Sequence, residues 1–265
     1  MKRWIPFMKS DPLVAVIRLQ GIIAGGGRGA LNDASLGPVI EKAFARGKPA
    51  AIALEINSPG GSPVQSSLIG ARIRRLADEK EIPVIAFVED VAASGGYWLA
   101  VAADEIYGDE SSIVGSIGVI SAGFGAHELM ARQGVERRVY TAGKSKSMLD
   151  PFRPEKPEDV ERLKTLLGDV HDNFIDHVKS RRGDKLDTET ELFTGEVWLA
   201  KKAQALGLID GIGHLKPMLK ERFGDKVQLR RYGVRRRFLA RFGAQMVNDA
   251  VASVEERAAF AQFGL

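Results

Sequence analysis

The chain has 265 residues, a formal net charge of +4, 45% hydrophobic and 27% charged residues, and no cysteine. This composition is typical of a globular protein with a sizeable core. It excludes disulfides and thiolate metal sites, and it gives no electrostatic reason to expect nucleic acid as a partner. No stretch approaches the ~20 apolar residues of a membrane span, and the apolar piece 4–8 is interrupted by Pro6, unlike a signal-peptide core. We therefore expect a cytoplasmic protein, free or peripheral to the membrane, unless a leader has been removed.

Apolar strand patterns alternate with helical patterns along the chain. This alternation, with strands apolar on both faces, predicts an α/β fold in which helices cover a mostly parallel sheet. No linker divides the chain, so we expect one domain over 1–265, with its core at about 13–223 and a basic, helical extension over 224–265. In chain order the pattern predicts a strand at 13–23, a glycine-rich piece at 25–29, a helix at 35–46, a strand at 50–57, a helix around 68–76, strands at 83–89, 105–108 and 112–120, a helix at 125–133, a strand at 137–143, a long helix at 157–181, and a strand, an Ala-rich helix and a turn within 192–213.

The segment 83–103 places a serine between an apolar strand and an apolar helix. The strand-like run 83–88 ends in an acidic turn, and the small residues around Ser94 are Ala92, Ala93, Gly95 and Gly96. A strand, a tight turn and a helix hold a serine hydroxyl at a helix N-terminus, where N–H groups favour developing negative charge. Ser94 is therefore the candidate nucleophile, although small residues at this place also serve close packing of a helix on a sheet.

The sequence NSPGG at 57–61 follows another apolar strand, at the edge where open α/β sheets bind ligands. Two glycines after a proline let the backbone turn sharply and present an unhindered N–H group. One N–H of this turn and one beside Ser94 are candidates for binding an oxyanion. A simple turn from strand to helix would use the same residues, so the motif alone does not settle its role.

A serine nucleophile needs a base, and spacing alone singles out none. No histidine lies in a small-residue turn at a strand end, so a Ser-His-Asp triad finds little support; the four are His127, His171, His177 and His214. Lys144 and Lys146 follow the strand expected at 137–143, with no acidic residue over 137–149. A lysine acts as a base only as the neutral amine, which an apolar pocket away from acids favours. A lysine pair in a loop is usually solvated, however, so the pattern leaves the base open.

Five segments follow one another in a familiar order: NSPGGS at 57–62, AASGGYWLA at 92–100, VGSIGVI at 114–120, TAGKSKS at 141–147 and TGEVWLAKKAQALGLIDGIG at 194–213. Together they resemble the signal peptide peptidase A family, which are serine peptidases with a Ser-Lys dyad. The resemblance extends over about residues 13–223. It implies a Clp protease/crotonase-like α/β core of mostly parallel strands with covering helices.

The resemblance also implies roles for individual residues. It gives Ser94 as the nucleophile, Lys146 as the general base, Gly61 as the donor of an oxyanion N–H, and Ser116 as the serine that hydrogen-bonds the lysine. Gly95 is the expected second oxyanion donor. The implied activity is the hydrolysis of hydrophobic or signal-peptide-like peptides through an acyl-enzyme, by a homo-oligomer that encloses its sites, and we expect neither cofactor nor metal. The chain lacks the family's usual N-terminal membrane anchor, which argues against a role outside the cytoplasm.

Two other functions are compatible with parts of the pattern. A crotonase-type acyl-CoA enzyme would use the same two N–H donors on a thioester enolate. It would, however, leave Ser94 and Lys146 without a role, and no carboxylate adjoins the glycine turns in the sequence. A scaffold subunit of the same fold that lacks activity is the second alternative, and only an assay distinguishes it from a peptidase.

The end of the chain has a chemistry of its own. The segment 230–241 reads RRYGVRRRFLAR, with six arginines and no acid, and apolar residues then recur at helical spacing up to Val254. We expect a helix over 235–256 that packs on the core or on a neighbouring subunit. Peripheral contact with an anionic membrane is the alternative, and nucleic acid is not expected because the rest of the chain is not basic.

Overall fold

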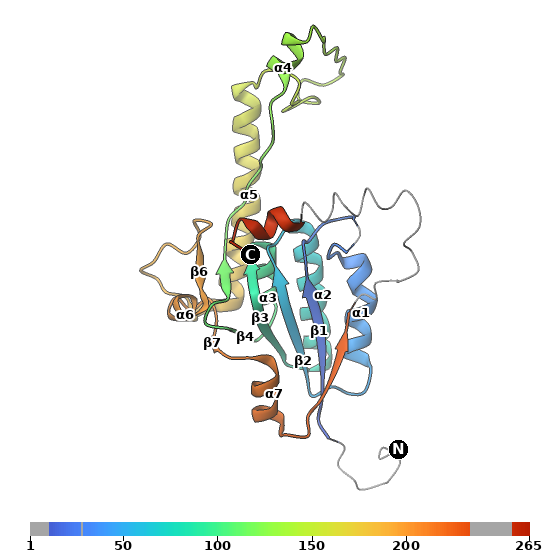
Figure 1. Ribbon diagram of the computed structural model, residues 1–265, viewed down its shortest axis with the longest axis vertical. Helices are drawn as coiled ribbons and strands as arrows, with labels where there is room; N and C mark the ends of the chain where they lie inside the picture. The colour runs from blue at the N-terminus through green and yellow to red at the C-terminus, as the bar shows by residue number, and fades with distance from the viewer. Residues whose placement is uncertain (1–10, 28, 234–255) are drawn as a thin grey trace.

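One mixed sheet forms the centre of the computed structural model, which describes residues 11–27, 29–233 and 256–265 (Figure 1). The strands in this part of the chain are β1 (Leu13–Gln20), β2 (Ala51–Ser58), β3 (Val84–Ala93), β4 (Glu105–Gly108), β5 (Ile113–Gly115), β6 (Val197–Leu199), β7 (Gly211–Ile212) and β8 (Gln228–Tyr232). The labelled helices are α1 (Asp33–Ala45), α2 (Pro63–Lys80), α3 (Gly95–Ala100), α4 (His127–Arg132), α5 (Pro157–Arg182), the short 3-10 turn η2 (Gly183–Lys185), α6 (Ala200–Ala205) and α7 (Leu215–Phe223), and residues 256–261 are also helical.

The strands are ordered β6-β5-β3-β2-β1-β8, and β4 pairs with both β3 and β7 beside this path. Every pairing is parallel except that of β5 with β6. Because β1, β2 and β3 run in the same direction, the turns that follow them meet at one edge of the sheet. This carboxyl edge is where open α/β sheets place their ligand sites.

Helices cover the two faces of the sheet unequally. On one face, a large core packs the strands against α1, α2 and α3, and Phe174 and Val178 of α5 join it. On the other face, a smaller core holds Val14 and Phe87 together with Leu219 of α7. The upper part of this second face is charged instead of apolar. There Glu55 of β2 pairs with Arg18 and with Arg231 of β8.

The local sequence explains how the elements around the carboxyl edge begin and end. Each residue of β2 is buried, as expected for an apolar strand with a parallel neighbour on each side. The helix α2 starts directly after the glycine turn that follows β2. Ser62 is its N-cap and accepts the N–H of Gln65 at 3.4 Å, and Pro63 occupies the first helical turn, where the missing N–H costs nothing.

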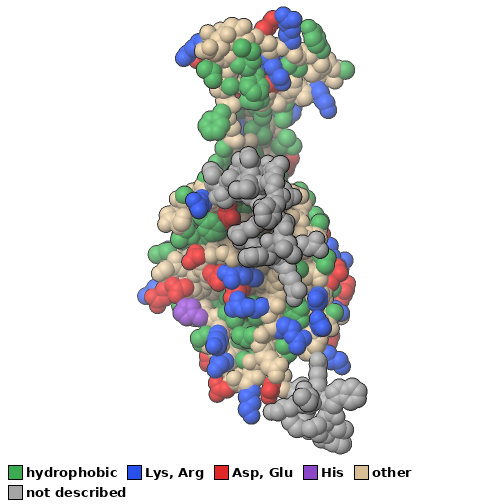
Figure 2. Space-filling view, turned by 45° about the vertical axis from the view of Figure 1, so that its right-hand side comes forward, with side chains coloured by type: hydrophobic (Ala, Val, Ile, Leu, Met, Phe, Trp, Pro, Cys, Tyr) green, Lys and Arg blue, Asp and Glu red, His purple; other side chains and the backbone are tan. Residues whose placement is uncertain are grey.

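A long projection leaves the body of the molecule. It consists of residues 120–156, which we call the arm, and of the first half of α5 (Figure 1). No residue of the arm is buried, and the first buried residue of α5 is Phe174. Large apolar side chains are nevertheless exposed there, with Phe124 at 94%, Tyr140 at 91% and Ile120 at 85% (Figure 2). An apolar surface of this kind is typical of a contact with another molecule.

The structure differs from the sequence-based expectations in several places. Strand β3 continues through Glu89 and Asp90, where the sequence predicted an acidic turn. Residues 137–143, expected as a strand, are irregular and lie in the arm, where no other strand is available for pairing. Residues 228–232, expected within a helical extension, form β8 and pair in parallel with β1. The helix expected at 235–256 falls outside the described residues except for Glu256, whose Oε1 lies 2.9 Å from the place that a Cβ on Gly21 would take.

None of the helices in the described ranges combines the length and the apolar character that crossing a membrane requires.

An ion pair joins the end of α5 to the sheet. The Arg182 guanidinium is almost wholly buried and lies 2.8 Å from the Asp210 carboxylate, which also accepts bonds from Lys185 and from the backbone N–H of Ile106. Burial alone would raise the pKa of Asp210, but the bonds from Arg182, Lys185 and Ile106 outweigh it and the pKa is lowered. The ionised carboxylate therefore stabilises the fold.

We expect Asp210→Asn to lower the free energy of unfolding at pH 7 by roughly 3–5 kcal/mol, because Arg182 is left buried without its partner. In the wild type this stabilisation is present above the ordinary carboxyl pKa of about 3.9 and is lost as the pH falls through the lower value of the folded state. The stability of Asp210→Asn should not show this decrease at low pH, because an asparagine side chain does not titrate. Urea titrations at several pH values measure both effects.

Asp225→Asn is the matched control, because the Asp225 side chain is 95% exposed and lies 3.8 Å from Lys220. This variant should unfold like the wild type at every pH. Equal stabilities of the two variants at pH 7 would contradict the importance of the Arg182–Asp210 pair.

Candidate active site

Ser94 is the single residue between β3 and α3. Its backbone has φ +51°, a conformation that residues other than glycine rarely adopt. The Ser94 N–H donates to Gly115 O at 2.8 Å, and the Ser94 carbonyl accepts the N–H of Trp98 at 3.0 Å. Residues 91–93 and 95–100 are all buried, whereas Ser94 is partly exposed. The strained turn thus presents one hydroxyl to solvent at the N-terminus of α3.

The glycine turn after β2 contacts this serine turn through the backbone. A Cβ on Gly60 would lie 2.8 Å from Ser94 Cβ and 2.8 Å from Gly95 N, and a Cβ on Gly96 would lie 2.4 Å from Ser58 O. Gly60 and Gly61 have φ values of +103° and +137°. Glycine is therefore required at these positions both by the conformation and by the space.

Two backbone N–H groups are free beside Ser94. Gly61 N lies 3.4 Å from the place that a Cβ on Gly95 would take, so the N–H groups of Gly61 and Gly95 are close together. Within the described ranges, neither donates to a protein acceptor. Two adjacent, unengaged donors next to a serine hydroxyl can bind the oxygen of a carbonyl that becomes negatively charged.

Ser116 lies close to the turn at Ser94, because the residue before it, Gly115, bonds to Ser94. Gly115 O holds the N–H of Ser94, and the N–H of Ser116 donates to Glu196 O at 2.7 Å. Ser116 also has a positive φ, +52°, and is partly exposed. The structure therefore brings Ser94, Gly61, Gly95 and Ser116 to one edge of the sheet.

Lys146 is not among these residues. It lies in the irregular segment of the arm between α4 and α5, and the arm extends away from the sheet (Figure 1). Lys144 and Lys146 are both exposed, so a single chain does not provide the apolar pocket that the sequence led us to expect around the lysine. The segment that carries Lys146 is thus available to another molecule.

The histidines have contacts of their own. His177 stacks on Trp98 with 4.5 Å between the ring centroids, and burial lowers its pKa. The Nε2 of His171 lies 3.0 Å from Ile117 O, and the Nε2 of His214 lies 2.8 Å from Asp109. No histidine in the described part of the chain hydrogen-bonds to Ser94, so the structure offers no Ser-His pair.

Sequence reasoning missed two polar contacts that adjoin the site. Ser58 Oγ accepts the N–H of Gly60 and donates to Gly21 O. Asn57 Nδ2 donates to the Asp90 carboxylate at 2.6 Å. Ser58 had a signal in the sequence, because a serine before Pro-Gly often bonds to the turn that follows it. The Asn57–Asp90 contact had none, since it depends on a register shift between β2 and β3.

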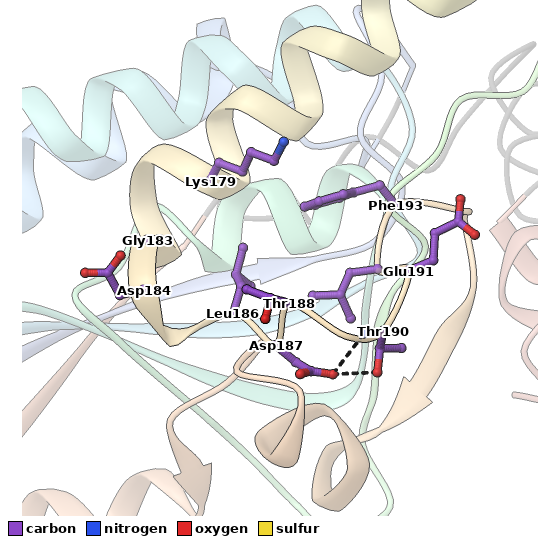
Figure 3. A pocket seen from close by; sticks show the side chains of 10 residues that line it. Lys179, Gly183, Asp184, Leu186, Asp187, Thr188, Thr190, Glu191 and Phe193 are labelled. Atoms are coloured by element: carbon purple, nitrogen blue, oxygen red, sulfur yellow. Dashed lines mark hydrogen bonds between the residues drawn. The ribbon is translucent and has the colours of Figure 1, made fainter.

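An open pocket lies away from the candidate site. It has a volume of about 550 Å³ and is formed by the end of α5 and the loop that follows (Figure 3). Leu186, Leu192 and Phe193 give it an apolar wall, and Asp187 bonds to Thr190 at its rim. It contains none of the candidate site residues. Among the described residues, no group of three or more His, Asp or Glu side chains is placed to hold a metal ion.

Comparison with a solved structure relates this fold to a known one. A mutant of the 1510-N membrane-bound stomatin-specific protease, solved in complex with a substrate peptide, superimposes with a TM-score of 0.53. The match covers 93% of this chain and 99% of that chain at 15% sequence identity. The likeness confirms the predicted α/β fold class.

Comparison with sequences relates the chain to peptidases. A Brucella abortus protein named Na(+)/H(+) antiporter NhaA is 48% identical over 286 residues, which cover 100% of this chain but 39% of that protein, so the chain spans well under half of this relative. A putative protease of Synechocystis is 32% identical over 200 residues, which cover 76% of this chain and 69% of that protein. The model of peptidase family S49 matches residues 77–227, more than half of the chain. The chain therefore belongs to peptidase family S49, the family of the signal peptide peptidase A proteins.

Proposed function

We propose that this chain is a serine endopeptidase that hydrolyses peptides through an acyl-enzyme on Ser94, with Lys146 as its general base. One observation carries the proposal. A strained, partly exposed serine lies at the N-terminus of α3 beside two N–H groups that have no acceptor among the described residues. Membership of family S49 supports the same activity and favours it over an acyl-CoA enzyme of related fold.

The proposed reaction has two half-reactions, and Lys146 acts first as base and then as acid in each of them. Neutral Lys146 takes the proton of the Ser94 hydroxyl while Oγ attacks the carbonyl carbon of the scissile peptide bond. The N–H groups of Gly61 and Gly95 bind the oxyanion, a contribution of about 2.7–4 kcal/mol for one donor in a well-studied protease. The C–N bond then breaks, and Lys146 returns the proton to the leaving amine. Lys146 then takes a proton from water, whose oxygen attacks the ester carbonyl; the bond to Ser94 Oγ breaks, and Lys146 returns the proton to Oγ, which regenerates Ser94 and the neutral amine.

The extended arm supports a dyad formed between two copies of the chain. Lys146 and the apolar side chains of Phe124 and Tyr140 are exposed on the same arm. A neighbouring copy that covers these side chains would receive Lys146 together with them. Burial against the neighbour's carboxyl edge would then favour the neutral amine, and Ser116 of that edge would supply a hydrogen bond to Nζ. In this arrangement, catalysis requires the predicted homo-oligomer.

The surroundings of Ser94 support peptides with apolar side chains as substrates. The residues that flank Ser94 in the chain, 91–93 and 95–100, are uncharged and mostly small or apolar.

Peripheral contact with a membrane remains a separate proposal for the basic segment 230–241. Two of its six arginines, Arg230 and Arg231, lie in β8, and Arg231 pairs with Glu55. These two therefore serve the sheet, and the contact with lipid rests on residues outside the described ranges.

Ser94→Ala and Lys146→Ala should each lower the hydrolysis of an apolar peptide by roughly 1,000-fold or more, and the double variant should be no worse than either single one, because the two residues act as a unit. Lys144→Ala is the matched control, since it removes the neighbouring exposed lysine of the same segment. It should keep most of the activity. Turnover numbers, with circular dichroism as a check on folding, decide the matter. Loss of activity in Lys144→Ala but not in Lys146→Ala would reverse our choice of base.

Mixing the two inactive variants tests whether the dyad is shared between copies. Ser94→Ala keeps Lys146, and Lys146→Ala keeps Ser94. If one copy supplies each residue, randomly mixed oligomers should regain about a quarter of the wild-type sites. The mixture is dissociated, reassembled and assayed against each variant treated alone. No regain of activity in oligomers that mass spectrometry shows to be mixed would place both residues in one chain.

A further inference from the structure

Ser58 is the last residue of β2 and lies beneath the glycine turn. It is wholly buried, with 0% of its surface exposed. Its Oγ donates a hydrogen bond to Gly21 O at 2.7 Å and accepts one from Gly60 N at 3.2 Å. A buried hydroxyl without partners destabilises a protein, whereas this one is satisfied in both roles.

The bond to Gly60 decides which N–H of the turn is left for a ligand. Pro59 has no N–H group, and the N–H of Gly60 is engaged by Ser58 Oγ. The carbonyl of Gly60 accepts the N–H of Ile23 at 2.8 Å. Gly61 is thus the residue of this turn whose N–H has no acceptor among the described residues.

Gly60 and Gly61 both have positive φ values and carry no side chain, so the turn needs hydrogen bonds to keep its orientation. Two consecutive peptide planes are held: the Pro59–Gly60 plane, whose N–H is bound by Ser58 Oγ, and the Gly60–Gly61 plane, whose carbonyl accepts the N–H of Ile23. Ser58 Oγ joins the first of these planes to the Gly21 backbone, which is itself bonded to β2 through Gly21 N and Asn57 O at 2.9 Å.

We infer that Ser58 is a positioning residue whose hydroxyl orients the Gly60–Gly61 turn so that the Gly61 N–H points at the developing oxyanion. This inference rests on the proposed function of Ser94. Ser58 does not touch the substrate in this account and acts only through the turn. Its effect should therefore appear in the transition state, where the oxyanion forms, and not in the binding of the substrate.

Ser112 is a matched control of the same chemistry. It is 1% exposed, accepts the N–H of Asp109 and donates to the backbone carbonyls of Val88 and Glu89. It belongs to the loop between β4 and β5 and makes no contact with the glycine turn. Ser112→Ala should lower the stability of the protein as Ser58→Ala does, but it should leave the Gly60–Gly61 turn unchanged.

We expect Ser58→Ala to lower kcat for a peptide substrate by about 10-fold to 100-fold with little change in KM. A peptide boronate, which mimics the tetrahedral intermediate, should bind more weakly by a similar factor. Ser58→Cys fills the same space but hydrogen-bonds poorly, and it should resemble Ser58→Ala. Ser112→Ala should match the wild type in kcat and in boronate affinity. An unchanged kcat in Ser58→Ala, or equal losses in Ser58→Ala and Ser112→Ala, would overturn the inference.

Amide hydrogen exchange tests the positioning without any assay of activity. The Gly60 N–H should exchange faster in Ser58→Ala than in the wild type and in Ser112→Ala, because its acceptor has been removed. Unchanged exchange at Gly60 would contradict the role of Ser58 even in an active enzyme. A wild type without Ser94-dependent hydrolysis would defeat the proposed function instead, and the exchange rates would still decide whether Ser58 holds the turn.

Discussion

The close approach of two backbone turns at the carboxyl edge of the sheet is the constraint on which the site depends. The turn after β2 and the start of α3 lie so near each other that a Cβ on Gly60 or Gly96 would come within 3 Å of backbone atoms of the other turn. This contact requires β2 and β3 to be adjacent and parallel, and it requires α3 to begin immediately after Ser94. The same approach places the N–H groups of Gly61 and Gly95 beside one hydroxyl. Packing and chemistry therefore demand the same glycines.

Local sequence patterns predicted this edge well because its geometry is local. Positive φ values, small residues and apolar strands leave a signature within a few positions of Ser94 and Gly61. The long helix α5 was also confirmed over nearly its full length, because Pro157 marks its start and Gly183 its end. Strand β8 was missed because it has little apolar character, and two of its five residues, Arg230 and Arg231, are charged. Its pairing with β1 lies more than 200 residues away, where no local pattern reaches.

The contacts of a single chain do not explain the structure of the arm. The sequence 137–143 is rich enough in β-forming residues to predict a strand, yet a strand needs a partner, and the arm offers none. The exposed side chains of Phe124 and Tyr140 also indicate a contact with another molecule, since large apolar side chains do not stabilise a free surface. The resemblance in sequence predicts Lys146 as the base, and the fold places it on the arm, which extends away from the sheet edge that holds Ser94 of the same chain.

The proposed function requires Ser94 to be the nucleophile of a site that binds an oxyanion. Reaction with a fluorophosphonate followed by peptide mass spectrometry tests this most directly, because the phosphorus centre forms a covalent bond only with an activated serine and requires the oxyanion donors. We predict one adduct, on the peptide that contains Ser94, and its loss in Ser94→Ala. An adduct on a different serine, or undiminished peptide hydrolysis with Ser94 unlabelled, would contradict the account.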